Sequence, residues 1–480
     1  MALTVFAPVP SRRAAADTPA DRDRVVDLVR AVSLVVVVAG HSVMAVVAWP
    51  GGVPVLGNLL AAYPWTQALT WVLQIMPLFF FAGGAASAIS WDRHRARGGQ
   101  YPAWIWARAD RLLRPAFVYL VAAGVIAALV TAFAQPAASE PLMNLLTQLL
   151  WFLGVYLIVT ALAPLFLPTT PLRAAAVVLL LLAACGLVDG ARFFAGAPAA
   201  VGLLNFVLVW TVPAYLGSLR SHGVLDRVPR WVVGAVALVC VAANLALISH
   251  GPWPLSLVGM PGAEVSNVAP PTVVLALHSV VLVCGVTLLD APLARLAARP
   301  SVWRPATWVN LVAMTLYLWH LPVLVAVTTL GHVVGLDRAV RLGDDGWPVP
   351  DGWGYLLGSV VFWAVYAAGV WAVVRLMWPF EHAPLVWWDA APRSTAPSLR
   401  TATWVAALGC VGVGVSTLVL SGTGLAGFPW RIVDYAGLPL SAAGAIVALL
   451  VSGLAIRWAG APRRDVLRLR SAGAWAHLDG

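Results

Sequence analysis

Two residues in the first apolar stretch, Arg30 and His41, have types and a spacing that suit chemistry inside a membrane. Ten residues separate them, which on an α-helix is close to three full turns, so both lie on one face with His41 about 16 Å deeper. An ionisable side chain within a span is costly and marks a functional candidate, and a neutral histidine can accept a proton near neutral pH. We expect Asp27, one turn earlier, to pair with Arg30. The alternative is a snorkelling arginine and a hydrogen-bonded structural histidine.

A second histidine, His320, lies in the apolar stretch WVNLVAMTLYLWHLPVL. It is about as far from the start of its stretch as His41 is, so the two histidines should lie at similar depth if their helices are neighbours. Tyr317, three residues earlier, shares the face of His320. Packing alone remains an alternative for both residues, and the isolated His278 is interpreted as a structural histidine.

Three arginines, Arg108, Arg111 and Arg114, recur every third residue in WARADRLLRPAF. We expect an interfacial helix here, after which Pro115 opens the next span, where a missing N–H costs little. The regular spacing favours an anion site, because the guanidinium fork matches phosphate. The alternative is a basic membrane anchor that contacts anionic lipid.

The elements that would position these residues are membrane-spanning helices. Of the 480 residues, 61% are hydrophobic and 10% are charged, whereas a soluble protein has roughly 45–50% apolar and about 25% charged residues. The net charge of +10 comes from arginines alone, in short islands between apolar runs. This pattern excludes a soluble enzyme, a disordered chain and a nucleic-acid-binding module. It predicts an all-α polytopic bundle in the lipid bilayer.

Twelve apolar stretches are long enough to cross a bilayer. They lie near 25–49, 66–90, 115–134, 143–167, 173–189, 200–219, 231–249, 271–290, 307–331, 354–379, 403–422 and 437–457. Arginines concentrate at the N-terminus, in alternate loops and in the tail, which predicts that both termini face the cytoplasm. The predicted units are a disordered arm at 1–24, a ten-span core at 25–380, a linker at 381–402, two additional spans at 403–457 and a basic tail at 458–480.

These segments resemble the acyltransferase-3 family of bacterial multi-pass membrane O-acyltransferases over roughly residues 20–380. The resemblance is carried by residues 27–31 with His41, by MPLFFFAGG at 76–84, by the 108–115 arginine segment and by LYLWHLPVL at 316–324. One departure is that Ala82–Gly83 stands where the family has Ser-Gly, so any role of that hydroxyl is absent here. The family core has ten spans, and this chain adds two.

The resemblance implies roles for the residues that match. His41 would be the catalytic histidine, and Arg30 belongs to the same motif. Arg108 and Arg111 match the second basic motif, and with Arg114 they would hold the phosphates of an acyl-coenzyme A co-substrate, acetyl-coenzyme A first among these. Desolvation inside the membrane would help to keep His41 neutral. Further residues expected to support the site, by orienting the acceptor or His41, are Asp27, Tyr317 and His320.

The acceptor implied by the family is a hydroxyl of a sugar, glycolipid, envelope polymer or natural product. An acceptor outside the cell could bind near Trp347 and Trp353, in the loop at 332–353. The expected location is the bacterial cytoplasmic membrane, with no bound cofactor, no metal and no nucleic-acid partner. A transporter or flippase of a lipid-linked or small polar substrate is the competing hypothesis, although the second half of the chain has no second Arg–His span. A structural scaffold would leave the histidines and the ordered arginines unexplained.

Overall fold

The computed structural model describes residues 22–133, 136–260, 262–390, 397–435 and 438–461. The predicted arm at 1–24 and tail at 458–480 lie largely outside the described residues. The helices in the first half are α2 (Arg24–Met44), α3 (Leu59–Ala62), α4 (Thr70–Leu73), α5 (Met76–Ala96), α6 (Tyr101–Phe133), α7 (Pro136–Thr147), α8 (Leu150–Leu162), α9 (Pro171–Phe194), α10 (Asn205–Ser221) and α11 (Arg230–His250).

The remaining helices are α12 (Val273–Leu288), α13 (Asp290–Ala297), α14 (Pro300–Leu311), α15 (Ala313–Val333), α16 (Gly352–His382), α17 (Val386–Asp389), α18 (Leu399–Thr423) and α19 (Ala442–Gly460). Within the described residues, eleven helical segments are long and apolar enough to cross a membrane, and α12 with α13 forms a further candidate span bent by 67°. The prediction of an all-α polytopic bundle is confirmed, and the twelve predicted stretches all fall on these segments.

Two predicted boundaries were wrong. The helix α2 stops at Met44, and the chain continues as a strand, so His41 lies in the last helical turn. The arginine segment is not a separate interfacial helix, because α6 runs without interruption from Tyr101 to Phe133 with Pro115 inside it. A proline in a helix interior leaves the carbonyl four residues earlier, here that of Arg111, without its usual N–H donor.

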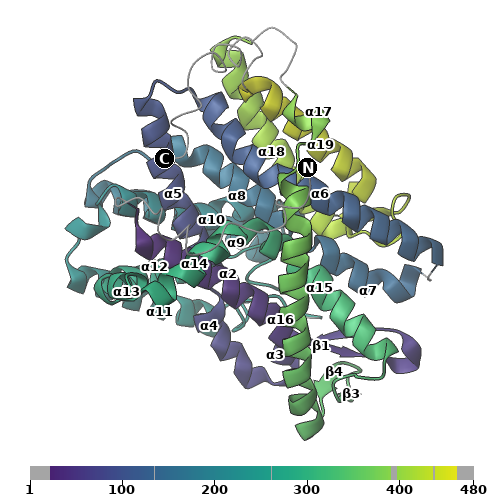
Figure 1. Cartoon of the computed structure of the whole chain (residues 1–480). Helices are drawn as coiled ribbons and strands as arrows, with labels where there is room; N and C mark the ends of the chain where they lie inside the picture. Colours follow the sequence, from purple (N-terminus) through teal and green to yellow (C-terminus); the bar gives the residue numbers. More distant parts are fainter. Residues whose placement is uncertain (1–21, 134–135, 261, 391–396, 436–437, 462–480) are drawn as a thin grey trace.

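Short antiparallel hairpins gather at the end of α2 that follows His41. They are β1 (Ala45–Ala48) with β2 (Val55–Asn58), and β3 (Val340–Leu342) with β4 (Pro348–Pro350). A third hairpin, β5 (Ile432–Tyr435) with β6 (Leu438–Ser441), joins α18 to α19. The first two hairpins pack on each other beside the start of α16 (Figure 1). The predicted polar loop at 332–353 is thus partly a hairpin that covers this end of the bundle.

The helices α5 and α10 approach each other most closely at two glycines. A Cβ added to Gly84 would lie 2.0 Å from the carbonyl oxygen of Ala214, and one added to Gly217 would lie 1.9 Å from that of Phe81. Neither position has room for a side chain. Small residues at the interface are what usually allows the backbones of two membrane helices to approach this closely. The glycines that end MPLFFFAGG therefore serve helix packing.

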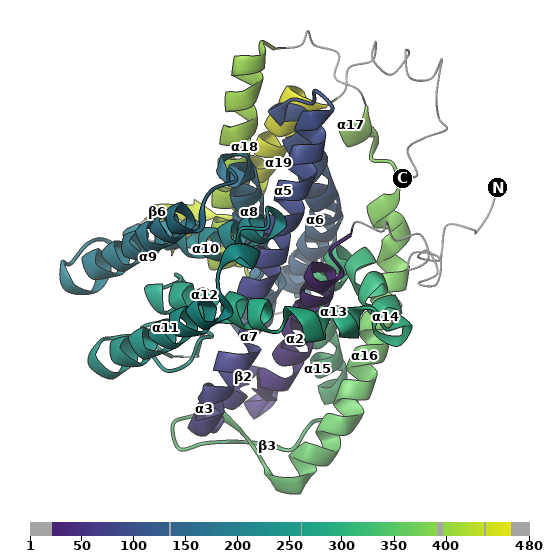
Figure 2. The ribbon, with the colours of Figure 1, turned by 90° about the vertical axis from the view of Figure 1, so that its left-hand side faces the viewer.

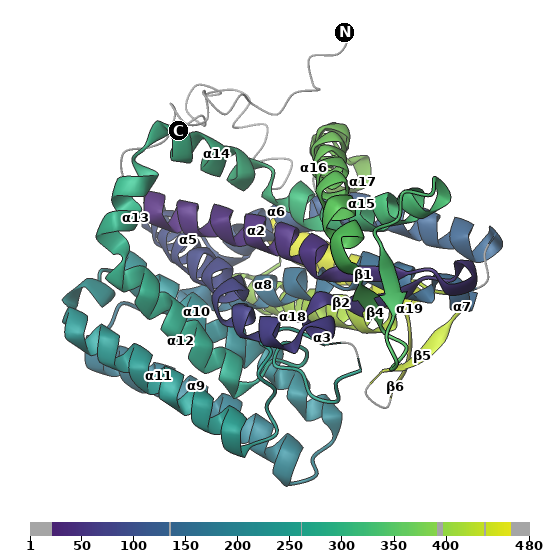
Figure 3. The ribbon, with the colours of Figure 1, turned by 90° about the horizontal axis from the view of Figure 1, so that it is seen from below.

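Helices α18 and α19 pack on each other, on α8 and on α6 (Figures 1 and 2). On the other side of the molecule, α9 and α11 project in one direction away from the remaining helices (Figure 2). Few of their apolar residues are buried within the chain, as expected for helices that face lipid. The site-bearing helices α2 and α15 pack on each other and lie on the opposite side of the molecule from α9 and α11 (Figure 3).

Candidate active site

The structure brings the two predicted histidines into direct contact. Nδ1 of His41, on α2, lies 2.9 Å from Nε2 of His320, on α15. The rings are stacked, with centroids 5.2 Å apart. His320 is fully buried, whereas His41 is only half-buried. The two residues are 279 positions apart in the sequence, so this contact exists only because α2 packs beside α15.

The hydrogen bonds of His320 define which ring nitrogen of His41 is free. Nδ1 of His320 lies 2.7 Å from the carbonyl oxygen of Tyr317 and 3.2 Å from that of Leu316. A carbonyl can only accept, so this nitrogen carries the hydrogen, and Nε2 of a neutral His320 is an acceptor. Nδ1 of His41 must then donate to it. Nε2 of His41 keeps its lone pair, as a general base requires.

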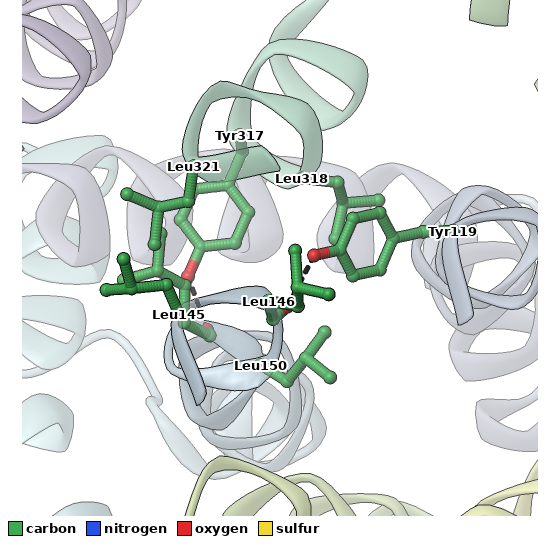
Figure 4. A pocket seen from close by; sticks show the side chains of 8 residues that line it. Tyr119, Leu145, Leu146, Leu150, Tyr317, Leu318 and Leu321 are labelled. Carbon is green, nitrogen blue, oxygen red and sulfur yellow. Dashed lines mark hydrogen bonds between the residues drawn. The ribbon is translucent and has the colours of Figure 1, made fainter. Parts of the chain in front are cut away.

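Tyr317 positions His320 through its backbone and the neighbouring helices through its side chain. The helix is interrupted between α7 and α8, and tyrosine hydroxyls supply donors to the carbonyls at this break. The Tyr317 hydroxyl donates to the carbonyl of Leu149 at 2.5 Å, and the Tyr119 hydroxyl donates to that of Leu146. Figure 4 shows both tyrosines pointing at this break, around a cavity of about 10 Å³. The Tyr317 hydroxyl is therefore engaged in holding the fold.

The structure also clusters three of the predicted arginines. Arg108 on α6 lies within electrostatic range of Arg111 and of Arg30 on α2, as well as of the Tyr156 hydroxyl. The Arg30 guanidinium lies over the Phe79 ring, with Cζ 5.5 Å from the centroid, and its buried Nε has no hydrogen-bond partner in the described part of the chain. Among the described residues, none of the three arginines has a carboxylate partner at ion-pair distance. Such a concentration of unpaired cations is suited to a polyanion.

Arg114 and Asp27 have other partners than those predicted. Arg114 forms ion pairs with Asp389, where Nη1 lies 3.0 Å from Oδ2, and with Asp110 at 3.5 Å. Asp27 pairs with Arg22 and not with Arg30. Both Nε and Nη2 of Arg22 donate to the Asp27 carboxylate. This hydrogen bond from Arg22 to Asp27 raises the pKa of the guanidinium. Arg114 and Asp27 thus stabilise the fold around the arginine cluster.

Glu381 is a buried carboxylate that the sequence analysis did not select. It is 1% exposed near the end of α16 and accepts hydrogen bonds from Trp319 Nε1 at 3.0 Å and from the Thr315 hydroxyl. Trp319 directly precedes His320, so this carboxylate fixes the helix that carries the histidine. Glu381 was placed at the start of the predicted linker at 381–402, just after the predicted span at 354–379, whereas α16 continues to His382 and buries it.

A cleft of about 450 Å³ lies at the hairpin end, beside Val43 of α2. Its walls are mainly apolar and aromatic, and they include Trp353, Tyr63 and the buried Ser359, whose hydroxyl has no hydrogen-bond partner among the described residues. Of the two tryptophans expected near an acceptor, Trp353 lines this cleft and Trp347 does not.

Other candidate groups lie apart from the histidine pair. His278 is 1% exposed, lies edge-on to Trp71 and has neither ring nitrogen hydrogen-bonded within the described part of the chain. Among the described residues, no group of three or more His, Cys, Asp or Glu side chains is arranged to hold a metal ion.

A family model described as an acyltransferase domain matches residues 23–382, which is more than half of the chain. The match begins at the start of α2 and ends at the end of α16. It therefore covers both histidines and the arginine cluster, and it excludes α17, α18 and α19. No curated protein and no solved structure matches the chain.

Proposed function

The chain belongs to the acyltransferase-3 family, and from this premise we propose that it is a membrane O-acyltransferase that moves an acyl group from acyl-coenzyme A to a hydroxyl group. The observation that carries this proposal is the arrangement on α2. A half-buried histidine, held by a second histidine, lies about 16 Å along the helix from a cluster of unpaired arginines. A base at one end and a polyanion site at the other suit this reaction.

The proposed step uses Nε2 of His41 as the general base. As the acceptor oxygen attacks the thioester carbonyl, Nε2 takes the hydroxyl proton. A C–O bond forms, the C–S bond breaks, and the imidazolium returns the proton to the departing thiolate, which gives the ester and free coenzyme A. His320 keeps Nδ1 of His41 hydrogen-bonded throughout, so that Nε2 is the nitrogen that takes up and returns the proton.

The arginines Arg30, Arg108 and Arg111 would bind the phosphates of the donor. Arginine pairs with phosphate through a planar fork of donors, and an arginine without a carboxylate partner loses no existing ion pair on binding. The distance between Arg30 and His41 along α2 suits a donor whose charged end stays at the arginines while a thin arm reaches the histidine.

The orientation follows from this assignment. Because acyl-coenzyme A is a cytoplasmic polyanion, the arginine end of α2 would face the cytoplasm of a bacterium, with both termini on that side and the chain in the cytoplasmic membrane. The acceptor, a sugar, glycolipid, envelope polymer or natural product, would then approach from the hairpin end. The aromatic cleft at Trp353 lies on this route of approach.

A transfer assay with the full chain in nanodiscs tests the proposal. Labelled acetyl-coenzyme A should be consumed with release of one thiol per ester formed on an added membrane glycan or glycolipid fraction. The His41→Gln variant should lose transfer by about 10²–10⁴-fold, as for loss of a general base, while remaining monodisperse. Undiminished transfer by that variant would reject His41 as the base. Substrate flux across vesicles without thiol release would instead support a transporter.

A further inference from the structure

Of the helices that lie beyond the matched family domain, α17 and α19 pack against the segment of α6 that carries the arginines, and α18 packs on α19. We propose that α17, α18 and α19 form a brace that fixes the position and rotation of this segment, with Trp388 and Asp389 as its positioning residues. The assignment rests on the proposed function insofar as Arg108 and Arg111 bind the donor. The brace itself is a statement about contacts and can be tested without turnover.

Helix α19 runs antiparallel along α6. Gly453 lies against Phe117 and Leu113, since a Cβ placed there would be 3.2 Å and 3.4 Å from their side chains. At the other end, a Cβ on Gly460 would lie 1.9 Å from the carbonyl oxygen of Pro102, where no side chain fits. The contact thus extends along the whole segment that contains Arg108 and Arg111. Helix α18 packs on α19 and also on α8 (Figure 1).

The short helix α17 holds the same segment with two side chains. Trp388 is 1% exposed, its ring packs on Phe117 and Trp106 with centroids 5.0 Å away, and its Nε1 donates to Asp110 Oδ1 at 2.6 Å. The next residue, Asp389, pairs with Arg114. The guanidinium of Arg114 also donates to the carbonyl of Ala383 at 3.2 Å.

These contacts all fall on one face of α6, and the donor arginines fall on the other. At 3.6 residues per turn, Trp106, Asp110, Leu113 and Phe117 share a face, and Arg108 and Arg111 point away from it. The accessible surface agrees, because Leu113 is fully buried while Arg111 is exposed. A brace on this face can hold the segment without blocking the arginines.

The segment needs support because of Pro115. This proline cannot donate a hydrogen bond to the carbonyl of Arg111, and such a position usually kinks or weakens a helix. The indole of Trp388 and the carboxylate of Asp389 bind Asp110 and Arg114, which each lie one residue before an end of the missing bond and so span the same turn. The external contacts therefore replace an internal one at the point where the donor arginines must be held.

Hydrogen–deuterium exchange and donor kinetics, both on the full chain in nanodiscs, test the brace. We expect Trp388→Phe and Asp389→Asn to speed exchange in residues 101–117, with α2 unchanged. They should also raise the KM for acetyl-coenzyme A by about 2- to 30-fold, the usual range for residues that couple through packing without touching a ligand, with little change in kcat. Trp404→Phe is the matched control, since Trp404 lies on α18 and is 63% exposed. The exchanged-charge pair Asp389→Arg with Arg114→Asp should restore both values toward wild type.

Each outcome decides the proposal. Unchanged exchange at 101–117 in both variants would overturn the brace. Faster exchange with an unchanged donor KM would show that the brace only stabilises the fold, which overturns the positioning role of Trp388 and Asp389. If the wild-type chain transfers no acyl group, the proposed function fails, and the exchange experiment still decides whether the brace exists.

Discussion

His320 holds His41 by accepting a hydrogen bond at Nε2, 2.9 Å from Nδ1 of His41, while its own Nδ1 is occupied by the carbonyl of Tyr317. The arrangement resembles the orienting partner of a catalytic histidine in other enzymes, with a neutral ring in place of a carboxylate. Its consequence is a difference between substitutions that keep an acceptor at this position and those that do not.

Replacement of His320 tests this difference. His320→Gln places a carboxamide oxygen near the position of Nε2 and should retain part of the activity. His320→Leu cannot accept from His41 and should lower kcat by more than about tenfold, up to the roughly 10⁴-fold loss seen when a catalytic histidine adopts the wrong tautomer. The measurement is kcat against pH for both variants. Equal rates for the two variants would mean that His320 only fills space.

Substitution of the unpaired arginines should affect the donor more than the acceptor. Arg108→Ala and Arg111→Ala should each raise the KM for acetyl-coenzyme A by about tenfold or more, the effect of losing one hydrogen bond to a charged group. Arg295→Ala, at an exposed position on α13, is the control. The assay compares KM for donor and acceptor, and a rise in acceptor KM alone would contradict the donor assignment.

The two tyrosines at the α7–α8 break should differ in their effects. Tyr119→Phe removes the hydroxyl donor to the buried carbonyl of Leu146 and should lower the free energy of unfolding by about 1–3 kcal/mol. Tyr317→Phe should cost less, because the carbonyl of Leu149 keeps the N–H of Phe152 as a donor. Both variants keep their backbone, including the carbonyl of residue 317 that holds His320, so kcat should change little in either one. Thermal unfolding in detergent and the transfer assay provide the two readouts. A stable Tyr119→Phe variant would contradict the capping role.

The contact between α5 and α10 should not tolerate a methyl group. In Gly84→Ala the new Cβ would meet the backbone of Ala214 at 2.0 Å, so the helices must separate, at a cost of about 1–3 kcal/mol or more. Gly285→Ala on α12 is the control, because its Cβ would meet nothing within 4 Å. The monodisperse fraction after extraction measures the effect. Equal yields of the two variants would show that α5 can move.

The sequence was sufficient to predict the spans and the depth relation between Arg30 and His41, because both depend on properties of one helix. Apolar length defines a span, and rise per residue defines a separation. Contacts between helices depend on their relative rotation, which packing determines. For this reason the pairing of Arg114 with Asp389 was not predicted. The pairing of Asp27 with Arg22 is local and was missed because Arg22 lies just before α2, in the predicted arm. The alternative of a purely structural His41 would leave its half-buried ring and unpaired cations at the other end of the site unexplained.

Local signals failed where packing outweighed them. Pro115 favoured a helix start, yet α6 continues through it, because neighbouring helices support the weakened turn. The hydrophobic run after His41 favoured a longer helix, yet the chain pairs as a strand from Ala45 onward. Arg338 illustrates the cause, since its Nη2 donates to the carbonyl of Ala45 at 2.6 Å from a distant loop. Burial among Tyr355 and Phe362 lowers the pKa of this guanidinium.

The early end of α2 bears on the size of molecule that the enzyme could modify. Only three residues of helix follow His41, against seventeen before it. Under the proposed function, the donor arm would have to cover the roughly 16 Å of helix between Arg30 and His41, about half the thickness of a bilayer core. An acceptor that arrives from the hairpin end would need to place one hydroxyl group next to His41, about one helical turn inside the end of α2. Bulk beyond that hydroxyl can stay in water, so that long polymer chains are as admissible as single sugars.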